Sequence, residues 1–498
     1  MRKGPSGQLV LVLALILATG AFYVATIRAG HSWGDDFAMY IHHAKNLAYG
    51  NAYADTGYIY NPNYPDIGPR AFPPLFPLLL APVYRIMGLD LGAMKALNIL
   101  LFLVFLLFLY LLFRPELPFS YVLAILSALA LNPYIWALKD QVISEFLFLL
   151  LMVLTFHSVA RYSERPTITS SIAVAACIAL SFACRTVGFL FLPCVLVYDV
   201  IRFKKLVPLT LKTAGLTLAL MAPQIIGFSG NGSNSSYADQ FQKISLGGAL
   251  SNVRMYLWLN YKEIWGNGYS PFPALLVCSA LGLLGLYGYV QRLRSSFTVV
   301  EIFVPAYAFL IVILWSRDQD TRLLIPIVPF WLFYAALGLR EVGKYRGRGL
   351  ELAVASGLLV LVLGSYAGTY SRTDFGPLAQ GLGDSRFTEL SEYVKTTTAK
   401  ESVFLFAKPR LLSLVTDRRA SGYQDPLKRD ELWDYCSEIG VNYIIASDTF
   451  DRDRHILEPF VAAHRDQMEE VFHNTEFHLY KVSPVSRPAF HALKTETR

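Results

Sequence analysis

Long apolar runs divide the first three quarters of this sequence into segments of membrane-spanning length. A helix needs about 20 mostly apolar residues to cross the hydrocarbon core of a bilayer, and eleven runs approach that length. They are Leu9–Ile27, Ala96–Phe113, Ser120–Leu138, Phe146–Ala160, Ile168–Cys184, Val187–Ile201, Leu206–Phe228, Phe272–Val290, Phe297–Trp315, Leu323–Leu339 and Leu350–Tyr370. This pattern predicts a mainly α-helical, polytopic membrane bundle.

A twelfth apolar run, Phe72–Met87, is short and contains four prolines. Charge decides whether it crosses, because the cytoplasmic loops of membrane proteins are rich in Lys and Arg. If it does not cross, six cytoplasmic segments totalling 40 residues hold 14 Lys and Arg residues. These segments are Met1–Gln8, Arg114–Phe119, Arg161–Pro166, Arg202–Lys205, Gln291–Ser296 and Arg340–Gly349. We therefore expect an interfacial or re-entrant helix here, eleven spans, the N-terminus inside and the C-terminus outside.

The polar C-terminal part shows a different pattern, in which short apolar strands alternate with amphipathic helices. The expected helices are Phe387–Thr398, Arg429–Ile439 and Arg452–Asp466, and the expected strands are Val403–Ala407, Val441–Ala446, Glu469–His473 and Glu476–Val482. Such alternation predicts a small α/β domain. We expect a membrane domain over residues 1–370 with a first outer loop at 28–95, an outer α/β domain over 371–485, and a tail over 486–498.

Composition agrees with a membrane protein and gives no support to nucleic-acid binding or to an ATP-driven pump. The 498 residues are 54% hydrophobic and 16% charged, whereas soluble chains carry about 25% charged residues. The net charge of +7 follows from basic cytoplasmic loops and indicates no nucleic-acid partner. The sequence contains no phosphate-binding P-loop, so an ATP-driven pump has no support. We expect a multi-pass protein of the plasma or inner membrane.

The first outer loop holds the most unusual polar residues. Asp35 and Asp36 stand side by side at the expected start of a helix. One carboxylate there is explained by helix capping, but two exceed what a cap needs. Asp36, Tyr40 and His43 share one helical face. A partly desolvated carboxylate near a membrane surface is suited to be a general base or a metal ligand.

Glu145 is the second acidic candidate, because it lies at the outer end of a predicted span. Acids at membrane depth are costly and are candidates for function; a first-turn acid that meets the helix dipole is the structural alternative. Asp35, Asp36 and Glu145 are also candidate ligands of a divalent metal ion, although no strict metal-binding motif is present. No other cofactor is indicated.

Arg70, Arg185 and Arg322 lie on the same predicted outer side. Arginine binds phosphate through two parallel hydrogen bonds, so these residues are candidates for holding the phosphate of a lipid carrier. The alternative is an arginine whose stem lies along apolar surface while its head reaches water.

Four segments together resemble the GT-C superfamily of membrane glycosyltransferases, and within it the protein O-mannosyltransferase and aminoarabinose-transferase-like group. GDDFAMYIHHAKNLAYG resembles the first-loop acidic motif, RAFPPLFPLLLAPVYRIMG its Pro-Pro segment, LNPYIWALKDQVISEFLFLLL its second-loop motif and TRLLIPIVPFWLFYAALGL its Arg-Tyr-Leu-Leu-Pro span. The likeness covers roughly Leu9–Leu339. Asp36 stands where the group usually has Glu, and Leu323 stands where Tyr is common.

The resemblance implies transfer of a sugar from a polyprenyl-phosphate carrier to a hydroxyl acceptor on a lipid, glycan or protein at the outer membrane face, with inversion. Asp35 matches the catalytic position, with Asp36 beside it, and Glu145 would support it. Arg70, Arg185 or Arg322 would neutralise the phosphate, and Tyr40 and His43 would contact the substrate. This requires Glu145 to fold back toward the acidic pair.

Two other functions are consistent with a membrane protein. A transporter of a lipid-linked or amphiphilic solute predicts repeated halves and ionisable groups in mid-span, whereas this sequence shows no repeat and its acids lie at span ends. A scaffold that only displays the outer domain would not need eleven spans.

Overall fold

The structure is a computed structural model that describes residues 5–62, 64, 67–205, 207–230, 245–266, 271–314, 321–423 and 429–483. It consists of two compact units. We call Met1–Ala29 with Phe72–Pro377 the helical unit, and Gly30–Ala71 with Leu378–Arg498 the α/β unit. Gly30–Ala71 of the expected first loop thus groups with the C-terminal part, a relation that the sequence did not indicate, whereas the rest of that loop belongs to the helical unit. The boundaries expected at 370 and 485 stay predictions, and the tail expected over 486–498 lies outside the described residues.

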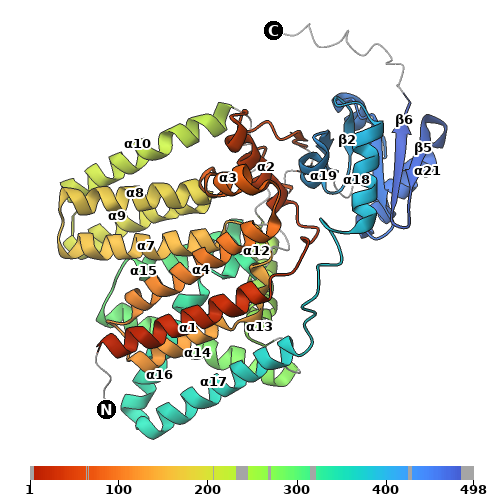
Figure 1. Ribbon diagram of the computed structural model, residues 1–498. Helices are drawn as coiled ribbons and strands as arrows, with labels where there is room; N and C mark the ends of the chain where they lie inside the picture. The colour runs from red at the N-terminus through yellow and green to blue at the C-terminus, as the bar shows by residue number, and fades with distance from the viewer. Residues whose placement is uncertain are drawn as a thin grey trace. The chain divides into compact units, whose positions relative to one another are not determined.

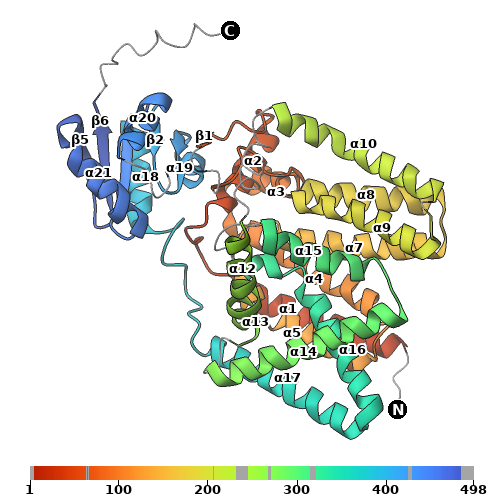
Figure 2. The same ribbon diagram turned by 180° about the vertical axis from the view of Figure 1, so that it is seen from behind.

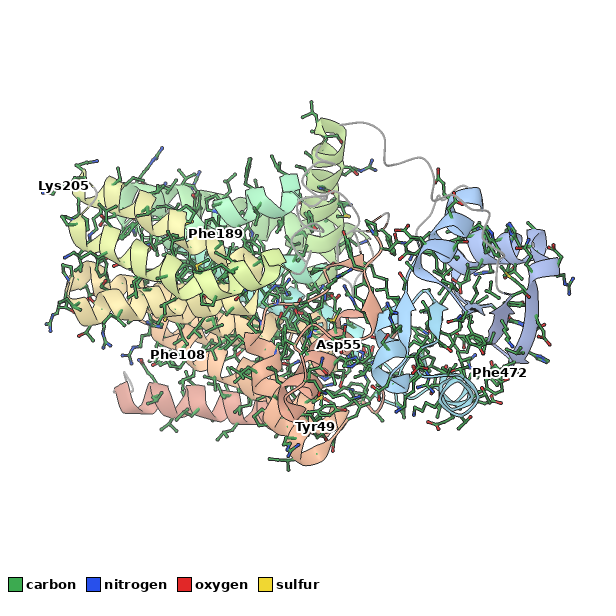
Figure 3. All side chains as sticks on the ribbon, turned by 90° about the horizontal axis from the view of Figure 1, so that it is seen from above. Tyr49, Asp55, Phe108, Phe189, Lys205 and Phe472 are labelled. Atoms are coloured by element: carbon green, nitrogen blue, oxygen red, sulfur yellow. The ribbon has the colours of Figure 1, made fainter. Side chains whose placement is uncertain are left out.

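The helical unit is built from apolar helices that run side by side (Figures 1 and 2). Its helices are α1 (Pro5–Ala25), α3 (Leu75–Met87), α4 (Leu91–Phe113), α5 (Phe119–Ala130), α6 (Pro133–Leu138), α7 (Glu145–Glu164), α8 (Ile168–Cys184), η2 (Thr186–Leu190), α9 (Phe191–Phe203), α10 (Pro208–Gly230), α12 (Leu246–Arg254), η3 (Met255–Asn260), α13 (Tyr261–Gly266), α14 (Pro271–Ser295), α15 (Val300–Leu314), η4 (Thr321–Leu324), α16 (Val328–Arg346) and α17 (Arg348–Tyr370). In Figure 3, Lys205 marks the end of the bundle at which α9 finishes.

Among the described residues, 7 helices are long and apolar enough to cross a membrane, and four shorter apolar helices accompany them. The chain is therefore a multi-pass membrane protein with a mainly α-helical fold, as the apolar pattern predicts. The count of eleven spans and the N-inside orientation stay predictions. The helix expected at Phe72–Met87 forms as α3 over Leu75–Met87, with Pro82 inside it.

Two predictions about the helices differ from the structure. The run Ser120–Leu138 is two helices, because α5 ends at Ala130 and the side chain of Asn132 accepts hydrogen bonds from the backbone N–H groups of Tyr134 and Ile135 to start α6. Asn followed by Pro at the first helical position is a strong start signal. The segment between the expected spans Leu206–Phe228 and Phe272–Val290, for which no helix was predicted, contains α12, η3 and α13, while residues 231–244 lie outside the described residues.

Helices α14 and α16 approach so closely that their backbones are in contact. A Cβ atom added to Gly288 would lie 1.9 Å from the carbonyl oxygen of Tyr334, and one added to Gly338 would lie 2.2 Å from that of Leu284. Small residues allow membrane helices to pack at such distances, where dispersion replaces the hydrophobic effect as the driving force. Gly282 lies on α14, as Gly288 does, but a Cβ atom added to Gly282 would have nothing within 4 Å.

We expect Gly288→Ala to destabilise the protein by about 1–3 kcal/mol, because the new methyl group forces α14 away from α16. Gly282→Ala is the matched control and should leave stability unchanged or slightly raised. Thermal unfolding in detergent, followed by tryptophan fluorescence, measures both. Equal stability of the two variants would contradict a backbone contact at Gly288.

The α/β unit is built around a six-stranded sheet with the order β1-β3-β2-β4-β6-β5. The first four strands are parallel, and β4, β6 and β5 pair antiparallel. Its elements are α2 (Asp36–Tyr49), β1 (Tyr58–Ile59), α18 (Ser385–Thr397), β2 (Val403–Leu405), α19 (Pro409–Thr416), β3 (Arg419–Ser421), α20 (Arg429–Ile439), β4 (Tyr443–Ser447), η5 (Asp453–Leu457), α21 (Glu458–Ala463), η6 (Arg465–Gln467), β5 (Met468–His473) and β6 (Phe477–Val482).

Alternation along the strands gives this sheet two apolar faces. Val403 and Leu405 point into a core shared with α20 and α21. On the other face, Phe406 stacks with Phe387 of α18. Trp33 of the first loop packs edge-on against Phe387 at 5.3 Å, and also against the rings of two further phenylalanines. The loop therefore supplies part of the core of the α/β unit.

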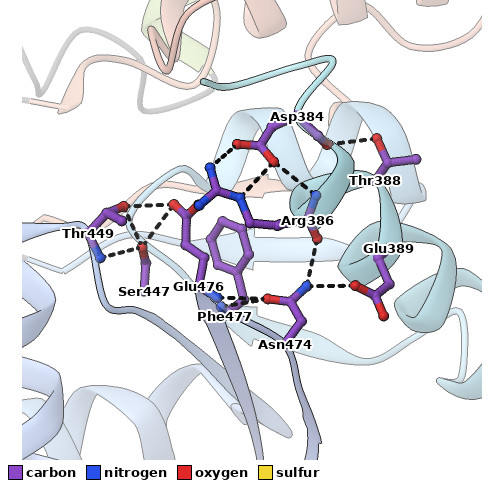
Figure 4. A network of polar contacts seen from close by, with 9 residues as sticks. All are labelled: Asp384, Arg386, Thr388, Glu389, Ser447, Thr449, Asn474, Glu476 and Phe477. Atoms are coloured by element: carbon purple, nitrogen blue, oxygen red, sulfur yellow. Dashed lines mark hydrogen bonds and ion pairs between the residues drawn. The ribbon is translucent and has the colours of Figure 1, made fainter. Parts of the chain in front are cut away.

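A polar network fixes the start of α18 to the turn between β5 and β6 (Figure 4). Asp384 accepts the backbone N–H of Arg386 at 2.9 Å and pairs with its guanidinium. The same guanidinium reaches Glu476 at 2.9 Å, and the side-chain amide of Asn474 donates to the carbonyl oxygen of Arg386. The residues of this network satisfy one another and have a structural role.

Most elements expected in this part of the chain are confirmed within a few residues of their predicted bounds. The helix expected over Arg452–Asp466 is confirmed in position, but its first part, η5, is a π-helix that continues into α21, and the short 3-10 helix η6 follows. The sequence did not indicate β1, α19 or β3. Both missed strands are only two or three residues long, too short to show a period.

Candidate active site

The residues predicted to form the site are divided between the two units. Asp35, Asp36, Tyr40, His43 and Arg70 belong to the α/β unit. Glu145, Arg185 and Arg322 belong to the helical unit.

Asp35 caps a helix, but not the one that the sequence indicated. It stands at the N-cap position of α2, yet its side chain makes no hydrogen bond to that helix. Instead its Oδ1 atom accepts the backbone N–H of Leu411, in the first turn of α19, at 3.1 Å. An anion at a helix N-terminus is stabilised by the unpaired N–H groups and by the helix dipole. One acid of the pair thus joins the first loop to the C-terminal part of the chain.

Arg410 holds both aspartates. Its guanidinium lies 3.8 Å from Asp35 Oδ2 and 3.2 Å from Asp36 Oδ1. It also donates to the carbonyl oxygen of Pro69 at 3.2 Å and lies over the ring of Tyr58, 4.7 Å from its centroid. The Arg410 side chain is only 1% exposed, so these contacts compensate for the loss of hydration.

Burial and charge act in opposite directions on Asp35. Burial raises the pKa of its carboxyl group, and the cations of Arg410 and Lys408 lower it by less. Burial also lowers the pKa of Lys408. A carboxylate whose pKa is raised is a stronger base at neutral pH. In addition, Asp35 Oδ2 is buried and has no hydrogen-bond partner among the residues that the structure describes.

The other loop candidates differ in exposure. Tyr40 is buried, and Arg70 is exposed. His43 is fully buried, stacks on Tyr53 and bonds through Nδ1 to the Tyr53 carbonyl oxygen at 2.8 Å. Burial lowers the pKa of His43 to about 3 and that of its neighbour His42 to about 4. Both imidazoles are therefore neutral at pH 7, and a role of Tyr40, His43 or Arg70 toward substrate stays a prediction.

Glu145 is the centre of the second group. It is the first residue of α7, and its side chain is 6% exposed. Its Oε1 atom lies 2.5 Å from Arg185 Nη1 and 3.7 Å from Arg322 Nη1. Its Oε2 atom is buried without a hydrogen-bond partner in the described part of the chain. Three of the predicted residues therefore come together, with two cations around one carboxylate.

A tight corner positions Arg185. The residue is extended (φ −147°, ψ 135°) between α8 and η2. A Cβ atom added to Gly188 would lie 2.3 Å from the backbone of Ser181, so only glycine allows η2 to fold back onto α8. The thiol of Cys184 meets the carbonyl oxygen of Ser144 at 3.6 Å and ties the corner to the start of α7. Arg185 and Glu145 are thus held by rigid helix ends.

The donor sets do not fit a divalent metal ion. Asp35 and Asp36 share the guanidinium of Arg410, and Glu145 faces two more, so each carboxylate already lies beside an arginine, and that cation repels a metal ion. In the described ranges, no group of three or more His, Cys, Asp and Glu side chains comes together.

Arg410 and Lys408 are the residues that sequence reasoning missed. Both are basic residues at the start of α19, where the helix dipole favours acids, but the sequence did not indicate this helix, so the conflict appears only in the structure. Such a local conflict points to an acidic partner elsewhere in the chain. The sequence does not show which acid that partner is.

Solved structures provide the comparison that decides the fold. ArnT from Cupriavidus metallidurans bound to undecaprenyl phosphate is 12% identical over 96% of this chain and 98% of its own, with a TM-score of 0.59. The Archaeoglobus fulgidus oligosaccharyltransferase in its apo form is 12% identical over 88% of this chain and 69% of its own, with a TM-score of 0.55. This chain has a GT-C fold.

The GT-C fold extends over almost the whole chain and confirms the architecture that the four motifs implied. Arabinofuranosyltransferase AftD from Mycobacteria is also similar, at 14% identity and a TM-score of 0.51, although this chain matches only 40% of it. No protein-family model and no curated protein matches the sequence.

We expect Arg410→Met to destabilise the α/β unit by about 3 kcal/mol, because it removes the guanidinium that faces both Asp35 and Asp36. Arg419→Met, at an exposed position of β3, is the matched control. Hydrogen exchange of α2 and α19 measures the effect. Adding Asp35→Asn to Arg410→Met should restore part of the lost stability. If it restores none, the ion pair between Arg410 and Asp35 is contradicted.

The two buried histidines predict a loss of stability in acid. Their folded-state pKa values lie below the unfolded value of about 6.5, so the unfolded chain binds more protons and stability falls as pH drops from about 6.5 through 4. His42→Gln combined with His43→Gln should weaken this dependence, whereas His455→Gln, at an exposed position, should not. Hydrogen exchange of α2 at pH 7.5 and pH 5, corrected for intrinsic rates, tests this; equal slopes in all three proteins would contradict it.

Proposed function

We propose that this protein is a glycosyltransferase that moves a sugar from a polyprenyl-phosphate carrier to a hydroxyl acceptor on the outer face of the membrane. One observation carries the proposal. In a chain with a GT-C fold, the side chains of Asp35 and Glu145 are 11% and 6% exposed and face arginines, and each keeps one buried carboxylate oxygen that has no hydrogen-bond partner among the described residues. Buried polar atoms in native proteins are nearly always paired, so these oxygens are suited to receive a substrate.

Asp35 acts as the general base in this proposal. Its Oδ2 atom takes the proton of the acceptor hydroxyl as the oxygen attacks the anomeric carbon of the sugar. The bond from that carbon to the phosphate oxygen breaks, and the electron pair leaves with the polyprenyl phosphate. Attack from the side opposite the phosphate inverts the anomeric centre. The raised pKa of Asp35 places the base closer to working pH.

Arg185 and Arg322 bind the phosphate in this proposal. Negative charge grows on the leaving phosphate in the transition state, and cations positioned in advance stabilise it there. Glu145 fixes Arg185 in place and keeps the pair of arginines from repelling one another. Arg70 is exposed and is available as a further phosphate ligand. ArnT, which shares this fold, was crystallised with undecaprenyl phosphate, and this favours a lipid phosphate as the donor's carrier.

Asp35→Asn and Glu145→Gln should each reduce sugar transfer by about 10²–10⁴-fold, the usual contribution of a general base or a charge positioned at the reaction. Asp55→Asn, at an exposed position of the same loop, is the control. Mass spectrometry of surface lipids, glycans and proteins from cells with and without the gene identifies the missing sugar, and the variants are then compared for restoring it.

Normal transfer by both site variants, at normal protein levels, would overturn the assignment of these residues. Unchanged surface glycans in cells without the gene, together with solute flux in proteoliposomes, would instead support the transporter alternative.

A further inference from the structure

A cavity of about 760 Å³ lies within the helical unit, apart from the groups described above. It is formed by the C-terminal ends of α4, α7, α9 and α14, together with the starts of α8 and α15 and part of α16. Four of the predicted cytoplasmic segments contribute to it: Arg114–Phe119, Arg161–Pro166, Arg202–Lys205 and Gln291–Ser296. Glu145 begins α7, whereas the cavity is lined by the second half of that helix, from about 14 Å to about 29 Å along it at 1.5 Å per residue.

The wall of this cavity changes from apolar to charged along the helices. Phe108, Leu112 and Phe156 line one part, and charged side chains gather at the helix ends. His157 lies between the two parts and bonds to the carbonyl oxygen of Phe108 at 3.0 Å. An amphiphile matches such a wall better than a wholly polar or wholly apolar solute does.

Among the residues that line the cavity, the deeper charged group has two carboxylates for one guanidinium. Arg292, 7% exposed, donates from Nη1 and Nη2 to the two oxygens of Glu116 at 2.9 Å each, and its Nε atom lies 3.5 Å from Glu301. Glu301 is buried and also accepts hydrogen bonds from Thr298 and Tyr334. Two carboxylates thus share one guanidinium. Glu116 is the accessible member, with 39% of its side chain exposed.

The outer part of the cavity carries the opposite balance. Arg161, Arg202 and Glu164 are exposed there. Arg202 is oriented by a 2.8 Å hydrogen bond to the Tyr198 hydroxyl. Two guanidiniums against one carboxylate favour a phosphate, which arginine binds through parallel hydrogen bonds. The cavity therefore presents a positive region and a negative region next to an apolar wall.

We propose that this cavity binds one zwitterionic phospholipid. The phosphate lies against Arg161 and Arg202, the ammonium group lies toward Glu116, and the acyl chains follow Phe108, Leu112 and Phe156. A polyprenyl phosphate brings negative charge alone, so it adds no cation to the region in which Glu116 and Glu301 share the guanidinium of Arg292. This lipid site is independent of the proposed sugar transfer.

Native mass spectrometry of the purified, delipidated full-length protein tests the proposal with three probes: dioleoyl phosphatidylethanolamine, dioleoyl phosphatidylglycerol and undecaprenyl phosphate. Phosphatidylethanolamine should be retained about tenfold more than phosphatidylglycerol, the difference of one good charged contact. Arg161→Gln with Arg202→Gln should lose about tenfold in retention of both phospholipids. Arg165→Gln, an exposed residue of the same segment that does not line the cavity, should behave like the native protein.

Glu116→Gln separates the two halves of the proposal, because it should remove the preference for phosphatidylethanolamine while phosphatidylglycerol is still retained. Equal retention of the two phospholipids by the native protein would overturn the proposal of a zwitterionic site. This comparison uses the native protein alone and does not depend on the folding of a variant. Stronger retention of undecaprenyl phosphate than of phosphatidylethanolamine would overturn it in favour of a polyprenyl carrier.

Discussion

The α/β unit depends on one buried guanidinium. Arg410 faces Asp35 and Asp36 and stacks on Tyr58, three residues of the first loop, while it belongs to a helix near the other end of the chain. Removing three charges from water costs several kcal/mol per ion unless each finds its partner. The arrangement is therefore stable only when loop and helix are both in place. The contact that builds the unit is also the contact that orients the proposed base.

In the helical unit, charged residues lie at both ends of α7. Glu145 starts this helix between two arginines, and Arg161 and Glu164 lie at its far end beside the cavity. The side chains between them are mostly buried and apolar, and they suit a hydrocarbon environment. Charged groups at helix ends cost less than charged groups in mid-span. One helix of about bilayer length thus keeps two polar clusters well separated.

The hydrophobic pattern predicted the membrane class and most helices, since periodicity and length are local properties. The acidic pair and Glu145 could be selected because acids near a membrane surface are unusual. Their partners could not be selected. Arg410 follows Asp35 by more than 370 residues, and nothing in a single sequence shows which of 44 Lys and Arg residues neutralises a given acid. Arg185 could be selected because it follows an apolar run close to bilayer depth. Its contact with Glu145 could not be predicted, because it depends on the tight corner at Gly188.

Strand β1 has a consequence for how this protein is made. Its two residues pair with β3, and the nearby Asn61 donates to the carbonyl oxygen of Gly422, 361 positions later in the chain. Loop closure over such a separation is slow and costs entropy before any contact forms. During synthesis the first loop emerges long before its partners do. Its acids, Trp33 and the edge of β1 therefore wait unpaired while most of the helical unit is inserted. A ribosome that stops early produces a membrane bundle whose first loop has nothing to fold against.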